Sequence, residues 1–394
     1  MIKRRILNFL ATRKESDTAT GQPILGYDRY TGEARGKALL SYLPDPVRDE
    51  LTGRPEFEFS NRGIARTLPR ALNELGYIVD IISWDDKKFS GDKSYDLLIQ
   101  HGGINYTQLA PLVKPGGKVV YFSSGSYWKY HNSQERARFR DFTERHSGAQ
   151  LPYDRLIMNS EEKVNREADA IIALGNSEVR KTYRSFPRVY NLDLACYPDQ
   201  HPDHIKKDFS VVKNNFLFFA GGGGIHKGLD LTIEAFLKLP QNLYIMAYIE
   251  PAVLEFYESA LKAPNIHWVG PGRFRSTQFY EVLDRCGFAI LPSCSEGQPG
   301  SMVECMNEGL IPVVSRDAHI DVEDFGHLLA PASIASISQV VKKLTHLEDP
   351  ELRHRSQKAR SSAMAKHSPE LFLANLKTYF SEIMDTTTSR DARE

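Results

Sequence analysis

Short apolar runs alternate with helical stretches along most of this chain of 394 residues. Apolar runs of strand length without polar alternation are typical of parallel strands that helices cover on both sides. The runs of the first half lie at residues 37–43, 77–84, 96–101, 118–123 and 168–175. Those of the second half lie at residues 216–220, 243–249, 266–270, 288–292 and 311–315. The pattern predicts an α/β fold with two doubly wound, Rossmann-like sheets.

A polar, aperiodic stretch that contains proline separates the two series of runs. Because the chain is too long for one ordinary core, we place a domain boundary there. The expected parts are an N-terminal arm or insertion (1–35), a first Rossmann-like domain (36–197), a linker (198–213), a second Rossmann-like domain (214–368), a C-terminal helix that packs back on the first domain (369–385) and a disordered tail (386–394). We expect a ligand-binding cleft between the two domains.

Charge and cysteine usage limit the class of protein. Lysine plus arginine and aspartate plus glutamate each total 50, so the formal net charge is zero and nothing favours nucleic acid as a partner. The four cysteines show no zinc-binding spacing, and so few cysteines in a chain of this size indicate reduced thiols in a cytoplasmic protein. No apolar run approaches the roughly 18 residues of a membrane span. The basic opening at residues 1–12 leaves peripheral membrane contact open, beside a short packed strand or a frayed arm.

The segment S-E-G-Q-P-G-S-M-V-E-C-M-N-E-G at residues 295–309 follows a predicted strand. Pro299 suits the first turn of a helix, whose first N–H groups and positive dipole end attract phosphate. The N–H groups expected to be free belong to Gly300, Ser301 and Met302. Glu296 precedes this helix and Glu304 lies inside it, so both carboxylates can accept hydrogen bonds from one sugar-containing ligand. An ordinary surface helix beside two glutamates is the alternative.

Four consecutive glycines, from Gly221 to Gly224, lie between a predicted strand and a predicted helix. Glycine lets the backbone approach a pyrophosphate, and Lys227 adds a positive charge at the start of the helix. The spacing matches neither the G-x-G-x-x-G dinucleotide motif nor the G-x-x-x-x-G-K-[ST] phosphate loop, which disfavours a dehydrogenase and a P-loop enzyme. A plain glycine turn remains the alternative.

These segments together resemble the retaining glycosyltransferases of the GT-B fold, in particular glycosyltransferase family 4. The resemblance covers residues 165–345 and rests on several ordered motifs. They are the E-x7-E pair Glu296 and Glu304, the dipeptide Lys227-Gly228, the base-binding segment I-H-W-V-G-P-G-R-F at 266–274, and the G-L-I-P-V-V step at 309–314. The resemblance implies that the second domain binds a nucleoside diphosphate sugar and that the first binds the acceptor.

The resemblance also assigns roles to residues. Glu296 would hold the hydroxyls of the donor sugar, Glu304 the ribose hydroxyls, and Lys227 the diphosphate. Gly222 stands where the family pattern has an arginine, and the cations that could replace it are His226, Arg273 and Arg275. The implied donor-binding residues are Gly221, Gly222, Gly223, Gly224, His226, Lys227, Arg273, Glu296, Gly297, Gln298, Pro299, Gly300, Ser301, Met302 and Glu304.

The first domain offers two histidines near predicted strand ends, His101 and His131. Strand ends of such sheets face the ligand crevice, so either could approach the reacting sugar, although a loop histidine without a direct role is the alternative for each. The implied catalytic residues are Glu296, Lys227, His131 and His101. Residues 138–146, R-F-R-D-F-T-E-R-H, predict a solvated helix with ion pairs.

The sequence as a whole predicts a retaining glycosyltransferase, a hexosyltransferase by type, that moves a sugar from a nucleoside diphosphate to a hydroxyl acceptor. Glycan or cell-envelope polysaccharide synthesis is the expected setting by family analogy. No D-x-D element occurs, so we expect no metal and no bound cofactor. A nucleotide-sugar 2-epimerase of the same fold and a non-catalytic nucleotide-sugar-binding scaffold remain open alternatives.

Overall fold

The computed structural model describes residues 21–53, 60–196 and 207–386, which divide into two compact units. The N-terminal unit contains residues 21–128, 158–196 and 368–386, and the C-terminal unit contains residues 129–157 and 207–367. The expected basic opening (1–12), most of the expected linker (198–206) and the tail from residue 387 lie outside the described residues.

A seven-stranded sheet with the order β1-β3-β2-β4-β5-β6-β7 forms the centre of the N-terminal unit. Its strands are β1 (Ile24–Tyr27), β2 (Gly36–Tyr42), β3 (Tyr77–Ser83), β4 (Tyr95–Gln100), β5 (Val113–Ser123), β6 (Ala170–Leu174) and β7 (Val189–Leu192). Neighbours are parallel except at the edge, where β1 pairs with β3 in the antiparallel direction. β1 lies within the range expected as an arm or insertion. Its mostly solvent-facing side chains explain why no apolar period marks it.

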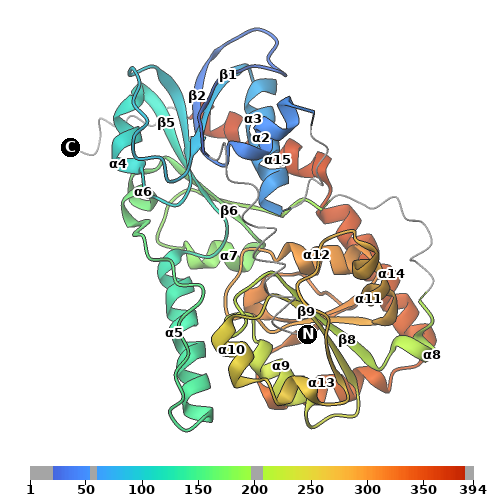
Figure 1. Ribbon diagram of the computed structural model, residues 1–394. Helices are drawn as coiled ribbons and strands as arrows, with labels where there is room; N and C mark the ends of the chain where they lie inside the picture. The colour runs from blue at the N-terminus through green and yellow to red at the C-terminus, as the bar shows by residue number, and fades with distance from the viewer. Residues whose placement is uncertain (1–20, 54–59, 197–206, 387–394) are drawn as a thin grey trace. The chain divides into compact units, whose positions relative to one another are not determined.

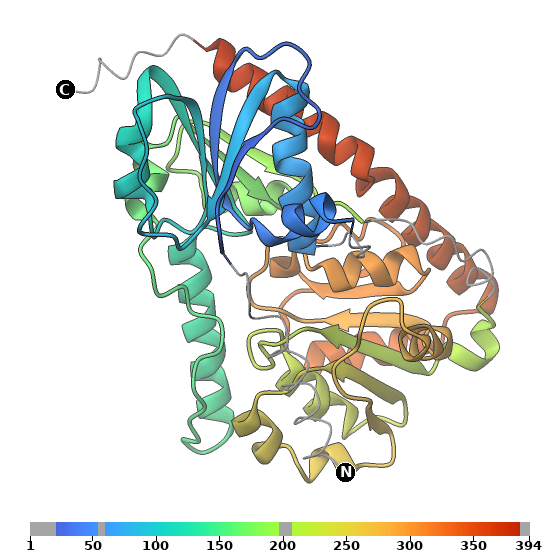
Figure 2. The same cartoon turned by 45° about the horizontal axis from the view of Figure 1, so that its top comes forward.

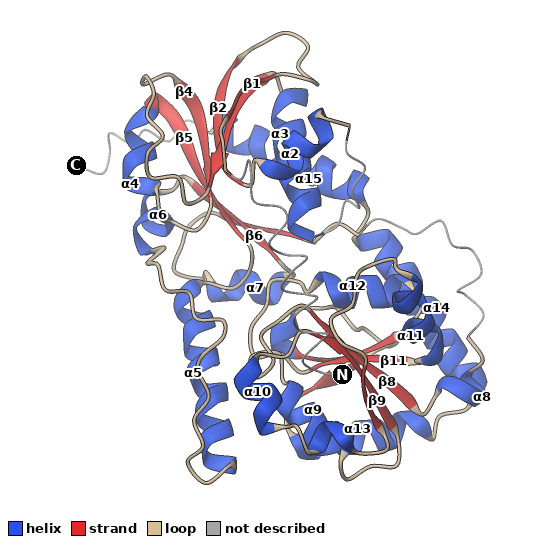
Figure 3. Cartoon of the chain, in the orientation of Figure 1, coloured by secondary structure: helices blue, strands red, loops and turns tan. Residues whose placement is uncertain are grey.

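Helices lie on both sides of this sheet (Figure 3). They are α2 (Asp45–Leu51), α3 (Ser60–Glu74), α4 (Tyr106–Leu109), α6 (Glu162–Glu167), α7 (Ser177–Thr182) and α15 (Pro369–Asp385). Leu39 and Leu40 of β2 belong to different hydrophobic clusters because successive side chains of a strand point to opposite faces. The unit therefore has two apolar layers, as the uninterrupted apolar runs predicted.

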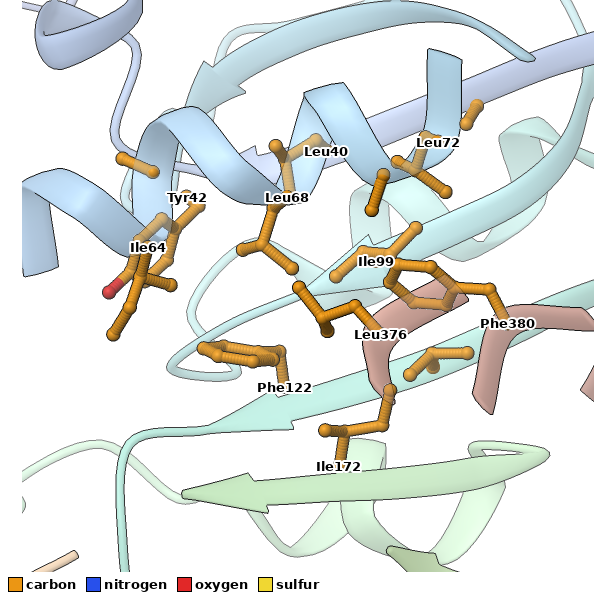
Figure 4. Packing of buried hydrophobic residues seen from close by; sticks show 14 of the residues in the cluster. Leu40, Tyr42, Ile64, Leu68, Leu72, Ile99, Phe122, Ile172, Leu376 and Phe380 are labelled. Atoms are coloured by element: carbon orange, nitrogen blue, oxygen red, sulfur yellow. The ribbon is translucent and has the colours of Figure 1, made fainter. Parts of the chain in front are cut away.

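The C-terminal helix α15 belongs to the N-terminal unit although it is the last helix of the chain. It packs on α3 and β7, and Figures 1 and 2 show it in red beside the blue α3. In Figure 4, Leu376 and Phe380 of α15 lie among Leu68 and Leu72 of α3 and Ile99 of β4. All five side chains are buried, so α15 completes this core.

The C-terminal unit contains a six-stranded, fully parallel sheet with the order β10-β9-β8-β11-β12-β13. Its strands are β8 (Asn215–Ala220), β9 (Asn242–Ala247), β10 (Ile266–Trp268), β11 (Phe288–Leu291), β12 (Ile311–Ser315) and β13 (His327–Leu329). Its helices after the linker are α8 (Phe209–Val212), α9 (Leu229–Phe236), α10 (Pro251–Phe256), α11 (Thr277–Arg285), α12 (Gly300–Asn307), α13 (Ile334–Thr345) and α14 (Asp349–Lys366). Both sheets have the Rossmann-like architecture that the alternating pattern predicted.

Helix α5 (Trp128–Arg145) comes from the first half of the chain, yet from Lys129 onward it belongs to the C-terminal unit. It lies beside α9 and α10 (Figure 1). The ion pairs expected at residues 138–146 include that of Arg145 with Asp141. The expectation that the stretch is solvated is wrong for one face, because Arg138, Phe139 and Phe142 are buried. Some of the charged side chains that suggested solvation instead contact another helix of the same unit. Arg145 pairs with Asp230 and Glu234 of α9.

The fold brings particular loops together. In a parallel sheet all strands end at the same edge, so the loops after β8, β9 and β11 are neighbours in space. These loops contain the glycine-rich segment and the glutamate segment of the sequence analysis. Among the helices that the structure describes, none is long and apolar enough to span a membrane.

Candidate functional site

The candidate site lies in the C-terminal unit at the carboxyl ends of β8, β9 and β11. The loop after β8 holds Gly221 to Gly224 and Lys227, and the loop after β11 holds Glu296. β8 is the neighbour of both β9 and β11, although β9 and β10 lie between β8 and β11 in the sequence. This strand order places residues 69 positions apart side by side.

Lys227 and Glu296 form a buried ion pair. Lys227 Nζ lies 2.6 Å from Glu296 Oε1, and the two side chains are only 10% and 12% exposed. Ser293 Oγ donates to the same carboxylate oxygen at 2.9 Å. Burial opposes ionisation of Glu296, but the positive charge of Lys227 and other nearby cations lowers its pKa to about 2. Glu296 is therefore an ionised acceptor near neutral pH, held against a lysine.

The backbone around this pair is also held closely. The N–H of Glu296 donates to the carbonyl of Asp317, and the Nδ1–H of His319 donates to the carbonyl of Glu296 at 2.8 Å. Gly228, directly after Lys227, has a φ of 79°. A Cβ at this position would lie 2.6 Å from Pro292 in the loop after β11. Only glycine lets the two loops approach this closely.

The glycine-rich loop faces a carboxylate. Glu250, which follows β9, accepts hydrogen bonds from the N–H groups of Gly223 at 2.7 Å and Gly224 at 3.1 Å. A Cβ on Gly222 would lie 3.1 Å from Glu250 Oε1. The sequence predicts that these amides face a ligand phosphate. In the structure two of them, those of Gly223 and Gly224, bind a protein carboxylate instead. Gly221 begins the loop and has open space where a side chain would lie.

Helix α12 begins at Gly300 with Pro299 as its N-cap residue, as expected. No side chain caps it within the described part of the chain. The N–H of Met302 donates to the carbonyl of Pro299 at 2.9 Å, so the expectation that it would be free is wrong. Gly300 and Ser301 contribute the first two N–H groups of the helix, for which the helix has no acceptor of its own.

The remaining residues of the predicted glutamate clamp lie around the same helix. Glu304 lies on α12 with its side chain buried, and Gln298 is buried in the preceding loop. Gly297 separates Gln298 from Glu296. The predicted clamp residues therefore lie within one loop and the helix that follows it, within a single unit.

A second polar cluster joins α5 to the glycine-rich loop. Both ring nitrogens of the buried His226 have acceptors, because Nδ1 pairs with the carboxylate of Glu135 and Nε2 lies 2.5 Å from the carbonyl of Ser295. Burial opposes ionisation of Glu135, but its hydrogen bond with His226 and the charge of that histidine lower its pKa. The ring of His131 lies 4.9 Å from that of His226.

Within the part of the chain that the structure describes, His131, Glu135 and His226 form a group that could hold a metal ion. One ligand atom from each lies within 4.8 Å of the others. The atoms already have partners, since His131 Nε2 donates to the carbonyl of Arg155 and Glu135 accepts from two backbone N–H groups in addition to pairing with His226. A metal ion would have to displace this hydrogen-bond network, so the donor set fits a metal poorly as it stands.

Two further predicted site residues lie on other elements of the chain. His101 belongs to the N-terminal unit, where its Nδ1 lies 2.8 Å from the carbonyl of Phe122 and its ring contacts Tyr42 edge-on. Burial lowers the pKa of His101, so its neutral form is favoured. Arg273 lies on the loop after β10 with an exposed side chain.

Sequence reasoning missed the contribution of α5 and of the segment that follows it. Glu135, Arg138 and Arg155 all reach the candidate site, and Arg138 donates to the carbonyl of Pro292 at 2.9 Å. The spacing of His131 and Glu135 places them on one face of a helix, which was the only available signal. No local sequence pattern indicates that Glu250 contacts the glycine-rich loop, because this contact depends on the strand order.

A scan against models of protein families finds no match to this chain, and neither does a search of curated proteins. Solved structures do match. Sucrose-phosphate synthase from Thermosynechococcus elongatus has a TM-score of 0.62 at 14% identity, covering 88% of this chain and 98% of its own. Anabaena HepE in complex with UDP and glucose has a TM-score of 0.59 at 11% identity, covering 88% and 100%. The chain has the GT-B fold.

A third match is WaaG, a glycosyltransferase involved in lipopolysaccharide biosynthesis, with a TM-score of 0.54 at 15% identity, covering 88% of this chain and 99% of its own. At these identities the likeness concerns the fold. The GT-B assignment confirms the predicted fold class of two Rossmann-like domains.

Proposed function

We propose that this protein is a glycosyltransferase that moves a sugar from a nucleoside diphosphate sugar to a hydroxyl acceptor. The observation that carries the proposal is the buried pair of Lys227 and Glu296 beside the uncapped start of α12, in a GT-B fold. A cation and a helix N-terminus suit a diphosphate, and an ionised carboxylate suits sugar hydroxyls. Solved structures of the matching Anabaena HepE contain UDP and UDP-glucose, which makes a uridine donor the first to test.

In this proposal, different residues bind different parts of the donor. Lys227 neutralises the diphosphate as the glycosidic bond breaks, and the N–H groups of Gly300 and Ser301 add to this stabilisation of developing charge. Glu296, ionised by its low pKa, accepts hydrogen bonds from the sugar hydroxyls. Glu304 binds the ribose hydroxyls from within α12. The unit that contains these residues is the donor-binding domain, which leaves the acceptor to the other.

The finer features of the proposal come from the family resemblance. We propose retention of configuration, hexosyl transfer and a reaction that needs no metal, since lysine and the helix start take the place of a cation bound to the diphosphate. A glycan acceptor in cell-envelope synthesis is the proposed setting, and the matching WaaG is a glycosyltransferase involved in lipopolysaccharide biosynthesis. We place the reaction in the cytoplasm.

A thermal-shift panel of the full chain tests the donor assignment. UDP, GDP, ADP and dTDP, each with excess EDTA and then with Mg²⁺, should yield one diphosphate that stabilises the protein without metal. Glu304→Gln should weaken that binding about 10- to 100-fold, the usual effect of removing a hydrogen bond to a charged group. Glu296→Gln should spare the free diphosphate and reduce discrimination among its sugar conjugates. Equal losses in both variants would contradict the assigned roles.

Turnover then separates transfer from the alternatives. Release of the diphosphate only when an acceptor is present supports glycosyl transfer. Conversion of the donor sugar without any acceptor would identify an epimerase, and tight binding without turnover across a panel of glycan acceptors would identify a scaffold.

A further inference from the structure

The buried basic side chains at the glycine-rich loop already have partners within the protein. Lys227 is paired with Glu296, and His226 is paired with Glu135. Lys227 and Glu296 are neutral as a pair, and the carboxylate of Glu135 faces the histidine. Glu250 adds a further carboxylate on two loop amides. A diphosphate carries several negative charges, so this environment needs another cation before it attracts one.

Among the residues that the structure describes, two arginines reach this loop. The buried Arg138 donates to the carbonyls of Ile225 and Pro292, whereas no such partner within the same residues binds the side chain of Arg155. Its Cγ and Cδ atoms lie 2.9 Å from the position that a Cβ on Gly223 would occupy, so its side chain runs across the bare backbone of the loop. Its charge reaches the ion pair as well. Burial opposes ionisation of Glu296, and Arg155 is among the cations that lower the pKa of that carboxyl.

The guanidinium of Arg155 is available to a ligand. Arg155 is exposed. Within residues 21–53, 60–196 and 207–386, its side chain makes no hydrogen bond or ion pair. Lys227, in contrast, is committed to a carboxylate 2.6 Å away. An arginine fork that is not already bound can form two parallel hydrogen bonds with phosphate oxygens.

The backbone of Arg155, unlike its side chain, is tightly held. Glu135 Oε1 accepts from the N–H of Arg155 at 2.9 Å and from the N–H of Asp154 at 3.1 Å. His131 Nε2 donates to the carbonyl of Arg155 at 2.8 Å. Asn132 bonds both backbone groups of Ile157, at 2.8 and 2.9 Å. Side chains from one face of α5 thus fix the main chain on both sides of an arginine whose own side chain has no such partner.

We propose that Arg155 binds the diphosphate of the donor and that His131, Glu135 and Asn132 are its positioning residues. The inference rests on the proposed function. It assigns to Arg155 the positive charge that the family pattern places at position 222, where this chain has glycine. A Cβ at position 223 would meet the side chain of Arg155, and the φ of 87° at this position favours glycine as well. His131 acts through Arg155 rather than on the reacting sugar.

Isothermal titration calorimetry of the full chain tests this proposal. The ligands are the nucleoside diphosphate that stabilises the wild type in the panel of UDP, GDP, ADP and dTDP, its matching monophosphate, and inorganic pyrophosphate. Arg155→Ala should weaken binding of the diphosphate and of pyrophosphate about 10- to 100-fold, because it removes charge-assisted hydrogen bonds. Binding of the monophosphate should change much less. Arg155→Lys should recover part of the affinity, since the charge returns without the fork.

Arg136→Ala is the matched control, because Arg136 is an exposed arginine of α5 and its loss changes the net charge equally. It should leave all three affinities unchanged.

Three results would overturn the assignment. If Arg155→Ala binds the diphosphate as the wild type does, Arg155 is not part of the site and the proposed function stands. If its affinities for the diphosphate and the monophosphate fall together, Arg155 supports the fold of the loop rather than the diphosphate. If the wild type binds none of the four diphosphates, the proposed function and this inference fail together.

Discussion

Replacing Lys227 with methionine should destabilise the C-terminal unit, because it leaves the carboxylate of Glu296 buried without its cation. The folded protein holds the pKa of Glu296 at about 2, compared with an ordinary value of 4.5. That difference corresponds to about 3 kcal/mol of preference for the ionised form. Removing one partner of a buried pair generally costs about 3–5 kcal/mol. We therefore expect a loss of about 3 kcal/mol near pH 7.

The loss of stability in Lys227→Met should depend on pH. A carboxyl group with a lowered folded-state pKa contributes stability that is complete above the unfolded value of 4.5 and disappears as the pH falls toward 2. Lys227→Met removes the largest favourable part of this contribution at every pH, and leaves the charges of His226 and Arg155 to favour the ionised form. The difference between the wild type and the variant should accordingly be largest near neutral pH and shrink on acidification below 4.5.

Fluorescence-detected urea unfolding can report on this unit alone. The chain has three tryptophans, and a background with Trp84→Phe and Trp128→Phe leaves Trp268 of β10 as the reporter. Adding Glu296→Gln to Lys227→Met should restore most of the stability, since no charge is then left unpaired. Lys262→Met, which breaks an exposed ion pair with Glu258, is the control and should have little effect. A Lys227→Met variant as stable as this control would refute the reasoning.

Two further predictions concern backbone and burial near the site. Gly228→Ala should lower the unfolding temperature markedly, because its Cβ would lie 2.6 Å from Pro292. Gly270 has a similar φ of 90° and open space around it, so Gly270→Ala should show the cost of the backbone conformation alone. Equal effects of the two substitutions would exclude the steric argument. Burial is the main cause that raises the pKa of Asp154 to about 8, and the negative charge of Glu135 is the second. Folding therefore favours the protonated acid. The free energy of unfolding should fall as the pH rises from 3.8 to 8. Asp154→Asn should remove this decline in thermal unfolding measured across that range, and a decline that persists would assign it to another group.

Much of the fold could be predicted from the sequence because the central strands are buried on both sides. The apolar runs at 77–84, 216–220 and 311–315 correspond to β3, β8 and β12 within about a residue at either end. The start of α12 at Gly300 followed from Pro299 and from the change of period. These are local properties, since strand burial and helix initiation depend on a few neighbouring residues.

The sequence order also located the candidate site at the loops after β8 and β11, since parallel strands end at one edge of a sheet. It did not show that Lys227 and Glu296 pair directly, or that Glu250 occupies two amides of the glycine-rich loop. Those contacts depend on which strands become neighbours, and strand order is not encoded in any local pattern.

The residues themselves thus determined the two Rossmann-like sheets, the glycine-rich loop and the position of the glutamate segment. Only the tertiary structure decided that α5 belongs to the C-terminal unit and supplies Glu135 and Arg155 to the loop. The physical reason is that charged residues on a helix have the same local pattern whether they face solvent or pair with a distant carboxylate. Arg145 shows this, because its partners Asp230 and Glu234 lie more than 80 residues further along the chain.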